Sequence, residues 1–335
     1  MKRGAFHSIS LAVLSVFAMD QTVFANSAPP QAAAAGYTMN TFSSTFHGDV
    51  DIHNTRAPGF NWYLAKFSGA RTTEASSLHF NSDGSLTLTS GGDTANDAIN
   101  SAADTGKPAP NDWVGTAFGG GGYFEAEFKF DPSFVMKPGA VGFPAWWLEP
   151  IEHIKRSGGA HWNGQASGFE HFTEVDIFEY NQWKQHSPNI YAGTVHEWYG
   201  IHNVTCPGKA FCHASNENNA TTQFANNLIV TPPGTDFRKY HKFGLLWVPA
   251  TNTSQGYLQY YFDGKPTNDR ITWSQYDEQK HKPFMLKTSA QSIPWVFGVL
   301  DRQHLVLILG TGNGQPMTIK DVNVWQKNSD QNLKQ

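Results

Sequence analysis

The stretch His171-Phe-Thr-Glu174-Val-Asp176-Ile-Phe-Glu179-Tyr180 decides the fold of this chain and points to its chemistry. The residues between its acids are β-branched or aromatic, which favours an extended strand. Residues of a strand alternate between its two faces, so Glu174 and Asp176 point the same way. Glu179 lies five positions after Glu174 and would face the opposite side of an ideal strand. One β-bulge at Ile177-Phe178 would restore the alternation and bring Glu179 onto the face of the other two acids.

Three carboxylates on one face repel one another and weaken a sheet, which chains tolerate where carboxylates do chemistry. Four effective strand steps would separate the outer Cα atoms by roughly 13 Å. Two glutamate side chains leaning together could close this to the about 5–5.5 Å gap of a retaining glycosidase. The inverting separation of about 6.5–9.5 Å is also within reach, so the spacing alone leaves the stereochemistry open. The alternative is a solvated acidic face on an exposed strand.

The composition limits the classes of partner. The chain has 335 residues and a formal net charge of -4, and 14% of its residues are aromatic, including 11 Trp and 24 Phe. The sequence has no polybasic patch, which argues against nucleic acid and anionic membrane surfaces as partners. This length accommodates one large β domain or two average ones.

Short extended stretches alternate with turn signals rich in Gly, Asn and Asp. We expect strands at 85–89, 123–130, 243–248, 257–262, 305–309 and 317–325. No long segment has the 3.6-residue period of a helix, so the pattern predicts an all-β sandwich. The segments 92–113 and 149–170 are rich in Gly, Ala and Asn, and we expect long loops there. Such loops often border a binding cleft, and they can also be passive connections. For 92–113 we favour a passive connection.

The N-terminus has the features of a secretory signal. Lys2 and Arg3 precede a short apolar core at 9–19, and Ala25 or Ala28 suits cleavage. This core is too short to span a bilayer, and an uncleaved anchor is the alternative. We expect a secreted or periplasmic protein with no membrane contact after cleavage. The expected divisions are a signal peptide at 1–25, a flexible leader at 26–36, one domain at 37–328 and a polar C-terminal tail at 329–335.

The two cysteines fit an exported protein. Cys206 and Cys212 bracket a short turn-prone loop, and an oxidising compartment would let them form a disulfide. The alternative is a pair of free thiols. Nearby histidines lack the spacing of zinc ligands, so we assign no metal ligand.

Several segments together resemble glycoside hydrolase family 16, a laminarinase- and lichenase-like family of the concanavalin A-like glucanase superfamily. The segment 174–179 matches the bulged form of the family's catalytic signature. The other matching segments, in the family's order, are Gly122-Tyr-Phe-Glu-Ala-Glu127, Phe143-Pro-Ala-Trp-Trp-Leu148, Thr194-Val-His196, Phe243-x-x-x-Trp247, Tyr261-Phe-Asp-Gly264 and the closing strand 316–325. The resemblance implies a concanavalin A-like jelly-roll β-sandwich of two curved antiparallel sheets with a concave substrate cleft.

The resemblance also implies catalytic roles. Glu174 would be the nucleophile, Glu179 the general acid/base, and Asp176 would hold the proton of Glu179. Neighbouring anions raise the pKa of one carboxyl group, so one glutamate can be charged while the other stays protonated. No cofactor is required. Some family members carry a structural calcium, but no loop here is distinctive enough to assign one.

Aromatic side chains suit a sugar cleft because they stack on the apolar faces of pyranose rings. Trp147 matches the family's cleft tryptophan, and Trp183 is the next candidate platform. Trp146 is either a second wall of the cleft or core. His196 matches a family histidine that could bond a carboxylate or a sugar hydroxyl, and a structural histidine is the alternative.

Together these features predict a monomeric, endo-acting glycoside hydrolase that cleaves a β-linked polysaccharide by a retaining double displacement. A transglycosylase would use the same intermediate. The preferred substrate is β-1,3 or mixed-linkage glucan. Segments 149–170 and 167–173 depart from laminarinase-like members, which keeps an agarase- or carrageenase-type galactan hydrolase as an alternative. A lectin-like, non-catalytic carbohydrate-binding module is the alternative outside the enzymes.

Overall fold

The computed structural model describes residues 27–64, 70–71, 73–90, 96–108, 110–154, 169–181, 187–201, 221–275 and 296–335. The expected signal peptide at 1–25, the candidate platform Trp183 and the expected disulfide between Cys206 and Cys212 lie outside these residues. Within the described residues, no helix is long and apolar enough to cross a membrane.

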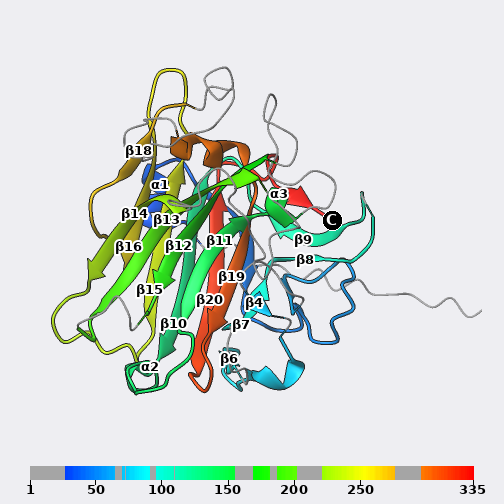
Figure 1. The fold of residues 1–335 in the computed structure, drawn as a ribbon, viewed down its shortest axis with the longest axis vertical. Coiled ribbons are helices and arrows are strands. Elements are labelled where there is room, and N and C mark those ends of the chain that lie inside the picture. Colours follow the sequence, from blue (N-terminus) through cyan, green and yellow to red (C-terminus); the bar gives the residue numbers. More distant parts are fainter. Residues whose placement is uncertain are drawn as a thin grey trace, which may run out of the picture.

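The first of two large sheets brings together strands from both ends of the chain. Over the described residues it has nine strands. At its centre β10 (Gly122–Phe130) pairs with β20 (Met317–Gln326), and these two strands lie side by side in Figure 1. Its other members are β1 (Met39–Ser44), β5 (Leu78–Phe80), β6 (Leu86–Leu88), β15 (His241–Val248), β16 (Gly256–Phe262), β17 (Lys265–Pro266) and β18 (Ile271–Trp273).

The second sheet carries the acidic stretch on β12 (Phe169–Glu179), with β11 (Ala145–Pro150) and β13 (Ile190–Ile201) as its neighbours. This sheet also has nine strands in the described chain and is mostly antiparallel. Its other members are β2 (Val50–Asp51), β3 (Trp62–Tyr63), β4 (Ala70–Arg71), β7 (Asn96–Asn100), β14 (Thr221–Val230) and β19 (Leu305–Thr311).

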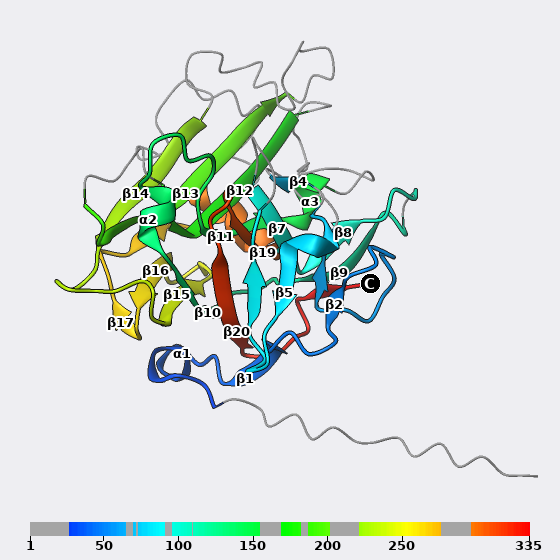
Figure 2. The same ribbon diagram turned by 90° about the horizontal axis from the view of Figure 1, so that it is seen from below.

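The two sheets stack face to face as two layers (Figure 2). Alternate residues of β10, namely Phe124, Ala126 and Phe128, are fully buried and share one core cluster with Phe178 and Leu309 of the second sheet. Neighbouring strands are often distant in the sequence, as in a jelly roll. The all-β sandwich is therefore confirmed, and the six expected strands correspond to β6, β10, β15, β16, β19 and β20.

A small third sheet lies against the outer face of the second sheet and is called here the cover sheet. It consists of β8 (Ala102–Asp104), β9 (Trp113–Ala117) and β21 (Leu333–Lys334). Trp113 and Ala117 of β9 share a buried cluster with Trp147 of β11 and Ile308 of β19. The polar tail at 329–335 thus contributes a strand to the cover sheet.

Two predicted loops contain regular structure. The segment 92–113 holds β7 and β8, so the expectation of a passive loop is wrong there. The segment of β7 contains Asn and Asp, which are depleted in strands, so its sequence does not predict a strand. Backbone pairing with β19 nevertheless holds it in the sheet. At the start of 149–170, β11 continues to Pro150 and the short helix α3 (Ile151–Ile154) follows.

The other helices of the described residues are α1 (Pro30–Ala34), α2 (Pro132–Val135) and the 3-10 helices η1 (Ala75–Ser77) and η3 (Val296–Arg302). Helix α1 lies in the segment that we expected to be a flexible leader. Ala32 is fully buried against the outer face of the first sheet, and the Gln31 side chain donates a hydrogen bond to the Tyr123 hydroxyl at 2.7 Å. The expectation is therefore wrong for this part of the leader, because apolar packing fixes the helix.

Candidate active site

Strand β12 contains one more residue than its neighbours in the middle of the acidic stretch. The register shifts against both β11 and β13 at this point. The flanking pairs are Trp146↔Phe178 and Trp147↔Asp176 on β11, and Asp176↔Thr194 and Glu179↔Ala192 on β13. Three steps along β12 therefore correspond to two along β13, which is the signature of a β-bulge. The bulge expected at Ile177-Phe178 is confirmed.

The bulge sorts the side chains of β12 onto two faces. Ile177 and Phe178 are consecutive, yet both are buried in the core between the large sheets, together with Val175 and Tyr180. The three acids lie on the opposite face, where Glu174 pairs in register with His196, Asp176 with Thr194, and Glu179 with Ala192. Because 192, 194 and 196 alternate regularly along β13, one face of the sheet carries all three acids.

Aromatic packing holds the bulge in place. The Phe178 ring lies 4.5 Å from the ring of Phe243, 4.8 Å from that of Tyr191 and 5.1 Å from that of Phe128, measured between centroids. These neighbours come from three other strands, β15, β13 and β10. Edge and tilted ring pairs of this kind each contribute about 0.5–1.5 kcal/mol beyond the area they bury. The packing of the Phe178 ring in the core therefore fixes the backbone that follows Asp176.

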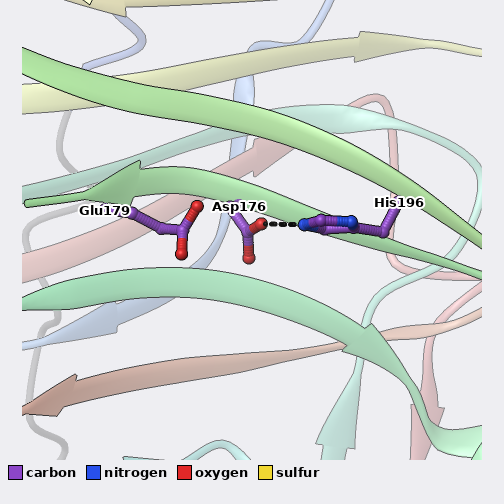
Figure 3. Close-up of side chains that lie close together, drawn as sticks. All are labelled: Asp176, Glu179 and His196. Carbon is purple, nitrogen blue, oxygen red and sulfur yellow. Dashed lines mark ion pairs between the residues drawn. The ribbon is translucent and has the colours of Figure 1, made fainter. Parts of the chain in front are cut away.

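Asp176, Glu179 and His196 form a compact group on the outer face (Figure 3). The His196 Nε2 atom lies 3.1 Å from Asp176 Oδ2, and Figure 3 shows the imidazole reaching across from β13 to the carboxylate. One ligand atom from each residue lies within 4.8 Å of the others. Asp176 is only 4% exposed, whereas Glu179 and His196 are half-buried. Asp176 thus forms the sheltered centre of the group.

Thr194 is a further residue of the site. It is fully buried, and its hydroxyl donates a hydrogen bond to Glu179 Oε2 at 3.4 Å. In the sequence, Thr194 stands out only as part of the segment Thr194-Val-His196. Its position two residues before His196 was a usable signal, because residues two apart on a strand share a face.

The adjacent tryptophans Trp146 and Trp147 point to opposite faces of β11. Trp146 is 0% exposed and belongs to the core between the large sheets. Of the two alternatives for Trp146, a second wall of the cleft or core, the structure shows the core. Trp147 pairs with Asp176 and shares its face, but it is only 6% exposed because Trp113 of the cover sheet packs in the same cluster.

Two further residues were not recognised as part of this region. Glu149 continues the alternation of Trp147 along β11 and is only 4% exposed. The sequence predicts a loop from residue 149, whereas β11 extends to Pro150 and so includes Glu149. Gln303, which follows η3, accepts a hydrogen bond from the Thr173 backbone N–H at 3.1 Å and so fixes β12 just before Glu174.

Tyr260 of the first sheet lies beneath the site strands. A Cβ atom on Gly193 would lie 3.0 Å from the Tyr260 ring, so the missing side chain lets the ring contact β13 between Ala192 and Thr194. Burial raises the pKa of Tyr260 well above its ordinary value, and the charge of Asp176 raises it further. Tyr260 therefore stays neutral under the site.

Comparisons with known proteins give matches only among solved structures. No protein-family model and no curated protein matches the sequence. The chain is similar to a GlcNAcα1-4Gal-releasing endo-β-galactosidase from Clostridium perfringens, with 16% identity, a TM-score of 0.45, and coverage of 85% of this chain and 62% of that one. An endo-1,3-β-glucanase from Streptomyces sioyaensis matches with 16% identity and a TM-score of 0.46, covering 88% and 96% of the two chains. LamAcat from Zobellia galactanivorans matches with 15% identity and a TM-score of 0.42, covering 88% of this chain and 100% of that one.

Proposed function

We propose that this chain is a secreted or periplasmic, endo-acting glycosidase that cleaves a β-linked polysaccharide with retention of configuration. The bulge in β12 carries the proposal, because it places Glu174, Asp176 and Glu179 on one face of the second sheet. Most glycoside hydrolases act through a pair of carboxyl groups that flank the scissile bond.

The register is compatible with a retaining pair. Glu174 and Glu179 lie opposite His196 and Ala192, four residues apart on β13. This corresponds to roughly 13 Å between Cα atoms, and each glutamate side chain can lean along the strand toward the other. The about 5–5.5 Å separation of a nucleophile and an acid/base is then within reach.

In the proposed mechanism, Glu179 donates its proton to the glycosidic oxygen while the Glu174 carboxylate attacks the anomeric carbon. The carbon–oxygen bond to the leaving sugar breaks, and an ester to Glu174 forms. Glu179, now a carboxylate, takes a proton from water, which attacks the same carbon and releases Glu174.

Asp176 is proposed to position the acid/base rather than to react. Its carboxylate lies between the two glutamates along β12 and is held by the His196 contact at 3.1 Å. The Thr194 hydrogen bond orients Glu179 from the other side.

A neutral β-1,3 or mixed-linkage glucan is the proposed substrate class. The described side chains that share this face near the acids include Trp147, Glu149, Thr194 and His196, and none of these is Lys or Arg. Sulfated galactans would be better bound by Arg and Lys. The exposed edge of Trp147 offers a small apolar contact for a sugar ring.

The experiment is a panel of laminarin, lichenan, agarose and carrageenan, assayed for new reducing ends. The wild-type chain is expected to release them from laminarin or lichenan, and Glu174→Gln should lower the rate by at least about 100-fold. Glu127→Gln is the matched control, because Glu127 is paired with Lys320 on the first sheet, away from the site, and should leave turnover unchanged. Binding without release from any polysaccharide would replace the enzyme with a carbohydrate-binding module.

A further inference from the structure

The group formed by Asp176, Glu179 and His196 has the chemistry of a metal site as well as that of a catalytic centre. It offers two carboxylate oxygens and one imidazole nitrogen, which is a mixed set that suits Zn²⁺ and related transition-metal ions. Within the described residues, this is the one group of three or more such side chains whose ligand atoms come this close.

The spacing of the three donors fits such an ion. Bonds of about 2.0–2.2 Å to a tetrahedral Zn²⁺ place neighbouring ligand atoms roughly 3.3 Å apart. The His196 and Asp176 atoms are already 3.1 Å apart, and the most distant atoms of the group lie within 4.8 Å. The ligand atoms of a zinc site are thus about 1.5 Å closer together than the 4.8 Å limit of this group. A rotation of the Glu179 side chain that moves its carboxylate by about 1–1.5 Å would bring the three ligand atoms to the spacing of a zinc site.

The backbone makes the group rigid on two sides. Asp176 and Glu179 are set by the bulge in β12, and His196 is fixed on β13 by its register with Glu174. Ca²⁺ and Mg²⁺ are poor candidates, because they prefer six or more oxygen ligands and the imidazole offers nitrogen.

We propose that Asp176, Glu179 and His196 bind a divalent transition-metal ion of the Zn²⁺ type, and that the bound ion inhibits the chain. The binding depends only on the geometry. The inhibition rests on the proposed function: the ion occupies the carboxylate that must give and take the proton, and it places a positive charge where the glycosidic oxygen would lie.

The first experiment measures Zn²⁺ binding to the EDTA-treated, dialysed chain by titration calorimetry at pH 7 in a buffer that does not bind metals. The wild type is expected to bind one Zn²⁺ at the tightest site. His196→Ala and Asp176→Asn should each weaken this site more than about 10-fold, since even residues behind the ligands affect affinity by 10–100-fold. Unaltered Zn²⁺ binding by both variants would overturn the proposal.

His241→Ala is the matched control. His241 Nδ1 lies 2.8 Å from Asp263 Oδ2, so this pair reproduces an imidazole beside a carboxylate without a third ligand nearby in the described chain. The control variant should bind Zn²⁺ as tightly as the wild type. Thermal unfolding without metal verifies that all variants are folded. A loss of the tight site in the control would contradict the assignment to the group on β12 and β13.

A second arm measures polysaccharide cleavage with increasing Zn²⁺ and then with excess EDTA. Inhibition with a constant equal to the calorimetric dissociation constant, reversed by EDTA, supports the inhibitory role. Full activity with the tight site occupied would overturn that role. If the chain cleaves no polysaccharide, the proposed function fails while the calorimetry still decides whether the metal site exists.

Discussion

Deletion of Ile177 tests the register on which the site depends. The bulge adds one residue to β12, so removing Ile177 leaves Val175, Phe178 and Tyr180 pointing inward in strict alternation. Asp176 can still pair with Thr194, and Glu179 with Ala192. The deletion should therefore straighten the strand and keep the acids on one face.

The expected cost follows from burial. Ile177 is 1% exposed in the core between the large sheets, and losing a side chain of this kind costs about 2–5 kcal/mol. A domain with about 5–15 kcal/mol of stability survives such a loss. Ile177→Ala is the matched control, because it removes the same side chain and keeps the bulge. The two variants should have similar free energies of unfolding.

The assays are urea unfolding followed by tryptophan fluorescence, and reducing-sugar release from laminarin and lichenan. The deletion variant should retain turnover within about 100-fold of Ile177→Ala, which is the range that a displacement of about 1 Å in a site can cause. A folded deletion variant as inactive as Glu174→Gln would refute the reasoning. That result would mean that the acids need the bulge itself and not only the alternation that it preserves.

Three further predictions concern packing, charge and orientation. Phe178→Ala should lower the free energy of unfolding by about 3–5 kcal/mol in urea, whereas the exposed Phe134→Ala changes it by no more than about 0.5 kcal/mol. The hydrogen bond to Asp263 raises the pKa of His241, although burial opposes the shift. Stability from a raised histidine pKa is fully present below the unfolded value of about 6.5 and is lost as the pH rises through the higher pKa of the folded state. His241→Ala should therefore be less stable than the wild type at pH 5.5 by under about 1 kcal/mol, and the difference should shrink by pH 9 in thermal melts. Thr194→Val should lower kcat about fivefold with little change in KM, because one hydrogen bond to Glu179 contributes about 1 kcal/mol; an unchanged kcat would show that this bond does not orient the acid/base.

The alternation of apolar and polar residues made the central strands predictable. Strands such as β10 and β20 have one buried face, so the period of two is visible in the sequence. The bulge could also be predicted, because Ile177 and Phe178 are adjacent apolar residues between acids that belong on one face. The same sequence could not say whether Trp146 or Trp147 faces the core, since either choice satisfies the alternation.

The cover sheet could not be predicted from local sequence. β21 is formed by Leu333 and Lys334, which pair with Ala117 and Thr116 from a distant part of the chain. β7 contains Asn and Asp, which are depleted in strands, and long-range pairing with β19 overrides that preference. The burial of Trp147 follows from this sheet, which is why the sequence suggested a more open platform than the structure has.

The configuration of the first product tests the central claim most directly. ¹H NMR of the reducing end released from laminarin or lichenan, recorded within the first minutes before mutarotation, distinguishes the β from the α anomer. If the bulge in β12 aligns Glu174 and Glu179 as nucleophile and acid/base, the β anomer appears first and no early product forms with Glu174→Gln. Early formation of the α anomer would contradict the account, because the two carboxyl groups would then act across a water molecule and not through a covalent intermediate.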